Sequence, residues 1–157
     1  MSHQPITLDP VAEKALAIAL YNSTKVLLRN PARTDVQDLE MIHMAHASGH
    51  HWRRVGTAQN FAISEWLCSR VYAVVNQPQT ALLHALASKK FCDTNLVEDW
   101  VLGFAEESLV RAFIANGDLD SAKLHYEAAK KIAETLDPKS REMLLSDLKD
   151  LNFGSSF

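Results

Sequence analysis

The sequence predicts an all-α protein, and three observations lead to this prediction. Only five glycines and five prolines occur in 157 residues, too few turn-forming residues for a many-stranded β fold. Capping and helix-breaking residues divide the chain into seven stretches of helical length. The chain also resembles itself when it is shifted by 41 residues, which is typical of a helical repeat. At this length we expect a single domain, 1–157, with one continuous core.

The helix boundaries follow from local residue chemistry. In Asp9-Pro10 and Asp137-Pro138, the carboxylate can accept from the first free amides and proline already has a helical φ, so these pairs mark the first and last helix starts. Between them, helix-breaking residues occur at Asn30-Pro31, Gly56, Asn76-Gln77-Pro78, Asp93-Thr94-Asn95 and Asn116-Gly117-Asp118. The expected helices are 9–30, 34–55, 57–76, 78–92, 96–116, 119–136 and 138–150.

The 41-residue shift aligns residues of the same chemistry. It pairs Glu65 with Glu106, Arg70 with Arg111, Ala81 with Ala122, Leu83-His84 with Leu124-His125, and Lys89-Lys90 with Lys130-Lys131. A further shift toward the N-terminus places Arg29 beneath Arg70 and His43 beneath His84, with Glu40 in the position of Ala81. The predicted repeats are therefore about 16–56, 57–97 and 98–138, and the first is the most divergent.

The turns at 77–81 and 117–122 resemble the turn of a tetratricopeptide hairpin, in which a small residue lets the second helix pack closely on the first. Tyr72 and Phe113 fit the aromatic position before that turn. The resemblance implies a right-handed superhelix of helical hairpins. Because an end hairpin cannot bury its apolar face alone, helix 138–150 is expected to cap the C-terminal end.

The chain also departs from the tetratricopeptide pattern. Its period exceeds the usual length of about 34 residues, which implies longer helices. Glu65 and Glu106 stand where that family usually has a large apolar residue. The residues of the chaperone-tail carboxylate clamp found in some tetratricopeptide proteins are not reproduced, so we do not expect chaperone binding.

Charge and composition disfavour nucleic acid and acidic membranes as partners. A net charge of −3 and a pI near 6.1 give no electrostatic preference for nucleic acid or an acidic membrane. The N-terminal residues 1–7 do not form a signal sequence, and no apolar run approaches the roughly 18 residues of a membrane span. We therefore expect a cytoplasmic protein. Cys68 and Cys92 lack metal-site or disulfide spacing and are interpreted as buried thiols.

The resemblance implies that helices 9–30, 57–76 and 96–116 line a concave groove. Their groove-facing pairs are Lys25 and Arg29, Trp66 and Arg70, and Glu107 and Arg111. Each arginine follows its partner by one helical turn, so Trp66 can stack on Arg70 and Glu107 can pair with Arg111. Arginine binds carboxylate or phosphate through two parallel hydrogen bonds, which favours an anionic ligand. The alternative is that the arginines are solvated or paired within the repeat.

A second candidate site lies in the histidine-rich segment 43–54. His43, His46 and His50 share one helix face at spacings i, i+3 and i+7 and could meet a transition metal. No cysteine or carboxylate nearby completes a zinc pattern, so polar surface histidines or a metal-free pocket role are the alternatives. We assign no metal and no cofactor. His84 and His125 recur at the repeat period, which indicates a shared packing role. Trp100 is interpreted as a core residue.

Three functions are compatible with this sequence. The first is a protein- or peptide-binding module with an arginine-lined groove. The second is a small-molecule-binding protein or an unfamiliar enzyme, using a pocket of glutamate, arginine and histidine side chains. The third is self-assembly, with a second copy as the partner. The candidate ligand-binding residues are Arg29, Asn60, Glu65, Trp66, Arg70, Glu107, Arg111, His46 and His51. No phosphate loop, nucleophile elbow or HExxH motif is present, so no catalytic residue is assigned.

Overall fold

The computed structural model describes residues 6–151, and these residues form seven α-helices and no strand. The chain is therefore all-α, as predicted. In chain order the helices are α1 (Pro10–Leu28), α2 (Asp35–Val55), α3 (Ala58–Val74), α4 (Pro78–Thr94), α5 (Asp99–Ala115), α6 (Leu119–Ala133) and α7 (Pro138–Asp150).

The helix ends are fixed by the residues that predicted them. A carboxylate oxygen of Asp9 accepts from the backbone amides of Val11 and Ala12 at 3.1 and 3.2 Å, and Asp137 caps α7 in the same way. Such a cap stabilises a helix by about 1 kcal/mol. Asn76 and Gly117 end α3 and α5 at positive φ, 59° and 79°. Both adopt the left-handed conformation that lets the chain reverse after a helix.

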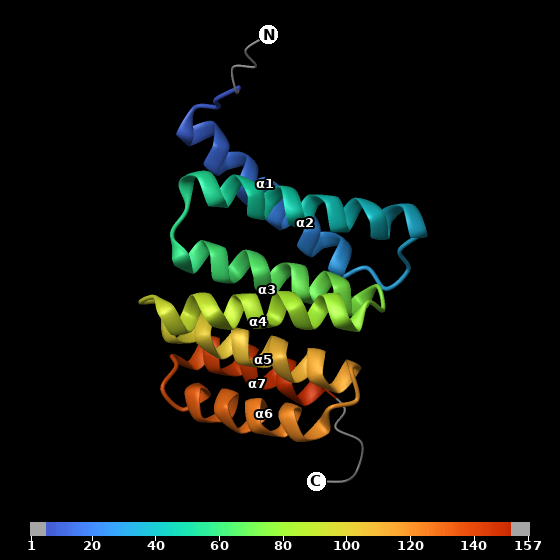
Figure 1. The fold of residues 1–157 in the computed structure, drawn as a ribbon, viewed down its shortest axis with the longest axis vertical. Coiled ribbons are helices and arrows are strands. Elements are labelled where there is room, and N and C mark those ends of the chain that lie inside the picture. The colour runs from blue at the N-terminus through green and yellow to red at the C-terminus, as the bar shows by residue number, and fades with distance from the viewer. Residues whose placement is uncertain (1–5, 152–157) are drawn as a thin grey trace.

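The helices pack as three antiparallel hairpins, α1–α2, α3–α4 and α5–α6, followed by α7 (Figure 1). The hairpins are stacked along the long axis of the molecule, so each contacts its neighbour. Helix α7 lies against both α5 and α6, where it buries Leu144 and Leu148. Burial of each leucine is worth about 1.5–3 kcal/mol, so α7 is an integral part of the C-terminal core.

The position of α7 depends on a close approach at Gly103. A Cβ atom at this position would lie 2.8 Å from Cδ2 of Leu144 and 3.3 Å from Cγ2 of Ile132. The first distance is shorter than packed carbon atoms tolerate. The glycine in α5 therefore makes room for both α6 and α7.

The second and third hairpins repeat the same contacts 41 residues apart. Nδ1 of His84 lies 2.6 Å from a carboxylate oxygen of Glu65, and His125 makes the same contact with Glu106 at 2.6 Å. Each imidazole is also stacked on an aromatic ring, Tyr72 under His84 and Phe113 under His125, with centroids 5.4 Å apart in both cases. The two histidines thus share a packing role.

The first hairpin follows a different register from the one that the 41-residue shift predicts. Oγ of Ser48 donates to the carbonyl of Ala17 at 2.8 Å, and Ser88 donates to Ala62 at 2.8 Å. These matching bonds span 31 and 26 residues, so the first hairpin contains five more residues between equivalent points. Helix α1 is consequently offset from α3 by 45 positions, and α2 from α4 by 40.

All three alignments predicted for the first repeat, those of Arg29, His43 and Glu40, are therefore wrong. Met41, which is fully buried, occupies the position of Ala81, whereas Glu40 is exposed. His43 is also exposed and does not correspond to His84. The α1–α2 connection, residues 29–34, is longer than the α3–α4 connection, residues 75–77, and α2 also begins earlier relative to Ser48 than α4 does relative to Ser88. A shift that allows no insertion cannot detect this difference.

None of the helices within residues 6–151 is both long and apolar enough to cross a membrane.

Candidate functional site

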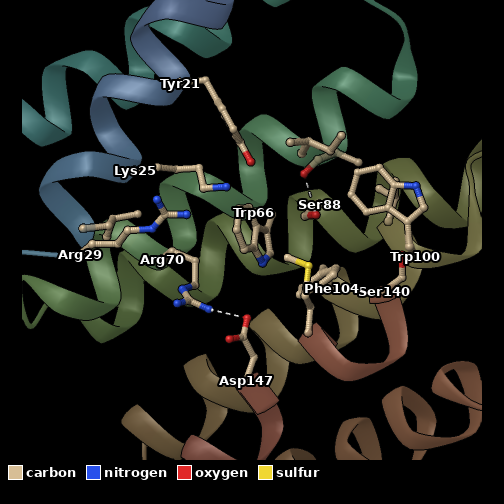
Figure 2. A pocket seen from close by; sticks show the side chains of 15 residues that line it. Tyr21, Lys25, Arg29, Trp66, Arg70, Ser88, Trp100, Phe104, Ser140 and Asp147 are labelled. Carbon is tan, nitrogen blue, oxygen red and sulfur yellow. Dashed lines mark hydrogen bonds and ion pairs between the residues drawn. The ribbon is translucent and has the colours of Figure 1, made fainter. Parts of the chain in front are cut away.

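A cavity of about 480 Å³ lies where α1, α3, α5 and α7 face one another (Figure 2). The helices α1, α3 and α5 are the inner helices of the three hairpins, and α7 supplies the remaining wall. The lining residues are Tyr21, Lys25, Leu28 and Arg29 from α1 and its C-cap, Ala62, Ile63, Trp66 and Arg70 from α3, Ser88 from α4, Trp100, Val101 and Phe104 from α5, and Ser140, Met143 and Asp147 from α7.

One side of this cavity is cationic. Figure 2 shows Lys25, Arg29 and Arg70 together on that side, with the carboxylate of Asp147 below them. Nη1 of Arg70 donates to Oδ2 of Asp147 at 3.1 Å. Burial lowers the pKa of Lys25, and the neighbouring charges of Arg29 and Arg70 lower it further. The charge of Asp147 acts in the opposite direction. Three cationic side chains thus face one carboxylate at this side, and an anion placed there would reduce the repulsion between them.

The pKa of Asp147 is shifted upward in the same environment. Burial is the largest cause, and the nearby carboxylate of Glu107 adds to the increase, while Arg70 and Arg111 act in the opposite direction. Asp147 is thus the carboxylate that neutralises part of the cationic side, although its surroundings oppose its ionisation.

Glu107 holds the side chains of this wall from behind. It is fully buried, and its carboxylate accepts from Nε of Arg111 at 3.0 Å and from Nε1 of Trp66 at 3.5 Å. Nη1 of Arg70 lies 3.5 Å from the same group. A buried carboxylate is tolerated only with such partners. Glu107 therefore positions Trp66 and Arg70 and does not itself line the cavity.

The other side of the cavity is aromatic and apolar. Trp66 lies between the two sides, with its ring 5.6 Å from the guanidinium carbon of Arg70. Phe104 packs edge-on against Trp66 and Trp100, with ring centroids 5.9 and 6.4 Å away. Side chains such as Ile63 and Met143 complete this wall. The cavity therefore offers an anion-binding side next to a surface suited to a hydrocarbon or an aromatic ring.

The sequence placed several of these residues together. Lys25, Arg29, Trp66 and Arg70 all line the cavity, and the stacking of Trp66 with Arg70 is confirmed. The pairing of Glu107 with Arg111 is also confirmed, but both side chains lie behind the wall. By the 45-residue offset, Lys25 and not Arg29 is the counterpart of Arg70. Arg29 lies one turn further along the chain.

Four other predicted groove residues are outside the cavity lining. Glu65 binds His84 and Arg53, and Asn60 accepts from the backbone amide of Thr57 at the start of α3. Asn60 is used in capping α3, and Glu65 is used in the contact between α3 and α4. The polar atoms of both side chains are therefore already hydrogen-bonded within the protein.

The two predicted histidines are also bound elsewhere. His46 contacts the hydroxyl of Tyr72 at 2.8 Å, and His51 contacts Glu13 at 3.1 Å. Within residues 6–151 no group of three histidine, cysteine or carboxylate side chains is arranged to hold a metal ion. The set His43, His46 and His50 is therefore not brought together as a ligand set.

Sequence reasoning missed Tyr21, Phe104 and Asp147 as wall residues. Trp100 packs against two buried clusters, as its interpretation as a core residue predicted, and it also lines the cavity. Asp147 follows Ser140 by seven positions, so both lie on one face of α7, but the sequence indicated only a capping helix there. The two thiols are buried as expected. Burial raises the pKa of Cys68 to about 12 and that of Cys92 to about 11, which keeps both protonated at neutral pH.

Comparisons of this chain with protein families, with curated proteins and with solved structures found no match.

Proposed function

We propose that the chain is a binding protein for a small organic anion with an apolar body, held in the cavity between α1, α3, α5 and α7. The observation that carries this proposal is the separation of the cavity into a cationic side, Lys25, Arg29 and Arg70, and an aromatic side around Trp66. A carboxylate or phosphate group would bind the cations, because guanidinium groups match its geometry. The remainder of the ligand would pack on the aromatic side.

The size of the cavity favours a small molecule over an extended peptide. About 480 Å³ lies within the range of about 300–1,000 Å³ that is typical of small-molecule sites. In an open tetratricopeptide-like groove the concave face would continue past the last hairpin. Here α7 adds Ser140, Met143 and Asp147 to the wall, which reduces the space available to an extended peptide.

A peptide remains a second candidate, in a restricted form. A chain that inserts only an apolar C-terminal residue would present a carboxylate to the cations and a side chain to the aromatic wall. This arrangement keeps the protein- or peptide-binding role expected for a tetratricopeptide-like repeat and uses the same residues. The exposed position of Arg29 at the cationic side favours it, since an approaching chain would meet this guanidinium first.

Calorimetric titration with hexanoate, hexanol and N-acetyl-leucine tests both forms. Hexanoate should bind and hexanol should not, because only the anion satisfies the cations. Binding of hexanoate should weaken about tenfold in Lys25→Gln and in Arg29→Gln, since one charge-assisted contact is worth about 1.5–3 kcal/mol. Lys131→Gln removes the same charge from an exposed position on α6 and should have no effect.

Two results would overturn the proposal. One is an absence of binding for both anions, and the other is equal affinity of all three variants. Much tighter binding of N-acetyl-leucine than of hexanoate would instead support the peptide form.

A further inference from the structure

The charges around the cavity do not cancel. Its wall carries Lys25, Arg29 and Arg70, and the carboxylate of Asp147 is the acidic group among the lining residues. Behind the wall, the buried carboxylate of Glu107 is shared between Arg111 and, at 3.5 Å, Arg70, so Glu107 and Arg111 together add no net charge to the site. The cationic side therefore has an excess of two positive charges. A ligand with one negative charge would leave one of them uncompensated.

The excess is confined to one region of the molecule. The whole chain has a net charge of −3, so this side of the cavity is opposite in sign to the average surface. Burial and the charges of its two neighbouring guanidinium groups already disfavour protonated Lys25. A doubly charged group would stabilise all three cations together.

The aromatic side has few polar groups left to recognise a ligand. Oγ of Ser88 is bound to the carbonyl of Ala62 at 2.8 Å. The indole nitrogens are also used, since Nε1 of Trp100 donates to Glu98 at 2.9 Å and Nε1 of Trp66 is directed to Glu107. The other neutral polar groups of the lining are the hydroxyls of Tyr21 and Ser140, too few to replace the hydrogen bonds that a polar body such as a nucleobase makes with water. This wall therefore fits a hydrocarbon chain or an unsubstituted ring.

We propose that the cavity selects an organic phosphate monoester in its dianionic form, with the phosphate at Lys25, Arg29 and Arg70 and an uncharged alkyl or aryl body against Trp66 and Phe104. This inference rests on the proposed function and narrows it from any organic anion to a dianion. The lysine and the two forked guanidinium groups offer donors for all three terminal oxygens of a phosphate monoester. The wall beyond Trp66 then contributes affinity through burial of the apolar body.

Hexyl phosphate and hexyl sulfate form a matched pair of probes. Both have a tetrahedral head and the same chain, but the sulfate stays singly charged while the phosphate carries two charges above its second pKa of about 6. Calorimetry at about pH 8 should show hexyl phosphate binding at least about tenfold tighter than hexyl sulfate. At about pH 5 the two affinities should converge, because the phosphate has gained a proton.

Both probes bind beside the same titratable groups of the protein. Tyr21, Lys25, Asp147 and the buried Glu107 face the cationic side from α1, α7 and α5. A proton taken up by Asp147 at low pH would strengthen binding of either probe. The ratio of the two affinities therefore reports the charge of the ligand.

Variants provide a second readout of the same ratio. Arg29→Gln reduces the excess charge to one and should lower the phosphate-to-sulfate ratio about tenfold, whereas Lys131→Gln on the exposed face of α6 should preserve it. Equal affinities at about pH 8 would overturn the dianion inference while leaving anion binding intact. Failure of both probes and of hexanoate to bind would overturn the proposed function as well. Hexanol binding as tightly as hexyl phosphate would show that the head group is not recognised and would also overturn the inference.

Discussion

Arg70 on α3 donates to Asp147 on α7 across the cationic side of the cavity, with Nη1 and Oδ2 3.1 Å apart. The two residues are 77 positions apart in the chain, so this ion pair joins the middle hairpin to the C-terminal helix. Both side chains remain partly accessible, at 26% and 31% of their full exposure. Such a pair contributes at most about 1 kcal/mol to stability. Its main consequence is electrostatic, because Asp147 occupies a position beside Arg70 that a ligand anion would share.

Replacement of Asp147 by Asn should therefore strengthen anion binding. The change removes one negative charge from the cationic side and keeps the shape of the side chain, so hexanoate should bind about five- to tenfold more tightly. The free energy of unfolding should change by less than about 1 kcal/mol. Calorimetry and urea unfolding measure the two quantities. Asp150→Asn removes the same charge from an exposed position at the end of α7 and should change neither, while weaker binding in Asp147→Asn would show that this carboxylate assists the ligand.

Glu65 should contribute stability that depends on pH. Burial opposes its ionisation, but the hydrogen bond and charge of His84, together with Arg53, outweigh this and lower the pKa of Glu65 below 4.5. A carboxylate with a lowered folded pKa stabilises the fold above its unfolded pKa and loses this contribution as pH falls through the folded pKa. Glu65→Gln should therefore cost about 1–3 kcal/mol at neutral pH, and the difference from the parent protein should shrink below about pH 4.5.

Urea unfolding at neutral and acidic pH measures this difference. The control is Glu40→Gln, since Glu40 is exposed on α2 and its replacement should be close to neutral at both pH values. A Glu65→Gln deficit that stays constant down to about pH 3 would contradict the assignment of the effect to the charged carboxylate.

Local residue chemistry was enough to predict the helices. The two Asp-Pro starts lie at α1 and α7, and the breakers at Asn76 and Gly117 lie just past the ends of α3 and α5. Each of these residues starts or ends a helix within a few positions of its own place in the chain. The same holds for the pairing of Glu107 with Arg111, which needs only one helical turn.

The remaining errors concern relationships between distant segments. The register of the first hairpin depends on the α1–α2 connection, where Nε of Arg33 binds Asp38 at 2.6 Å and Nη1 donates to the carbonyls of Leu27 and Asn30. These contacts hold a longer loop in place, and a fixed repeat length does not describe it. The position of Asp147 depends on how α7 packs beside Gly103. The spacing of residues within α7 does not indicate that Asp147 pairs with Arg70.

The packing of α7 can be tested at Gly103. In Gly103→Ala the new methyl group would lie 2.8 Å from Cδ2 of Leu144, so the buried Leu144 side chain or α7 itself must shift, and we expect a loss of about 1–3 kcal/mol in the free energy of unfolding. Gly49→Ala is the matched control, because its methyl group would lie 3.5 Å from Cβ of Ser64, an ordinary contact. That variant should be neutral, or more stable by up to about 1 kcal/mol from helix propensity. Equal effects of the two variants in urea unfolding would show that α7 adapts without strain.

The equivalence of the second and third hairpins predicts how Tyr72 tolerates substitution. Phe113 stacks on His125 as Tyr72 stacks on His84, so a ring without a hydroxyl fits this position. Tyr72→Phe keeps the stacking and removes only the 2.8 Å contact with His46, and its unfolding free energy should fall by less than about 1 kcal/mol. Tyr72→Ala also removes the ring and should lose about 2–4 kcal/mol, because the half-buried aromatic surface is no longer packed. Urea unfolding of both variants measures the difference. If Tyr72→Phe proved as damaging as Tyr72→Ala, the hydroxyl contact with His46 would be the dominant interaction, and the stacked ring would not explain why an aromatic residue recurs 41 positions later.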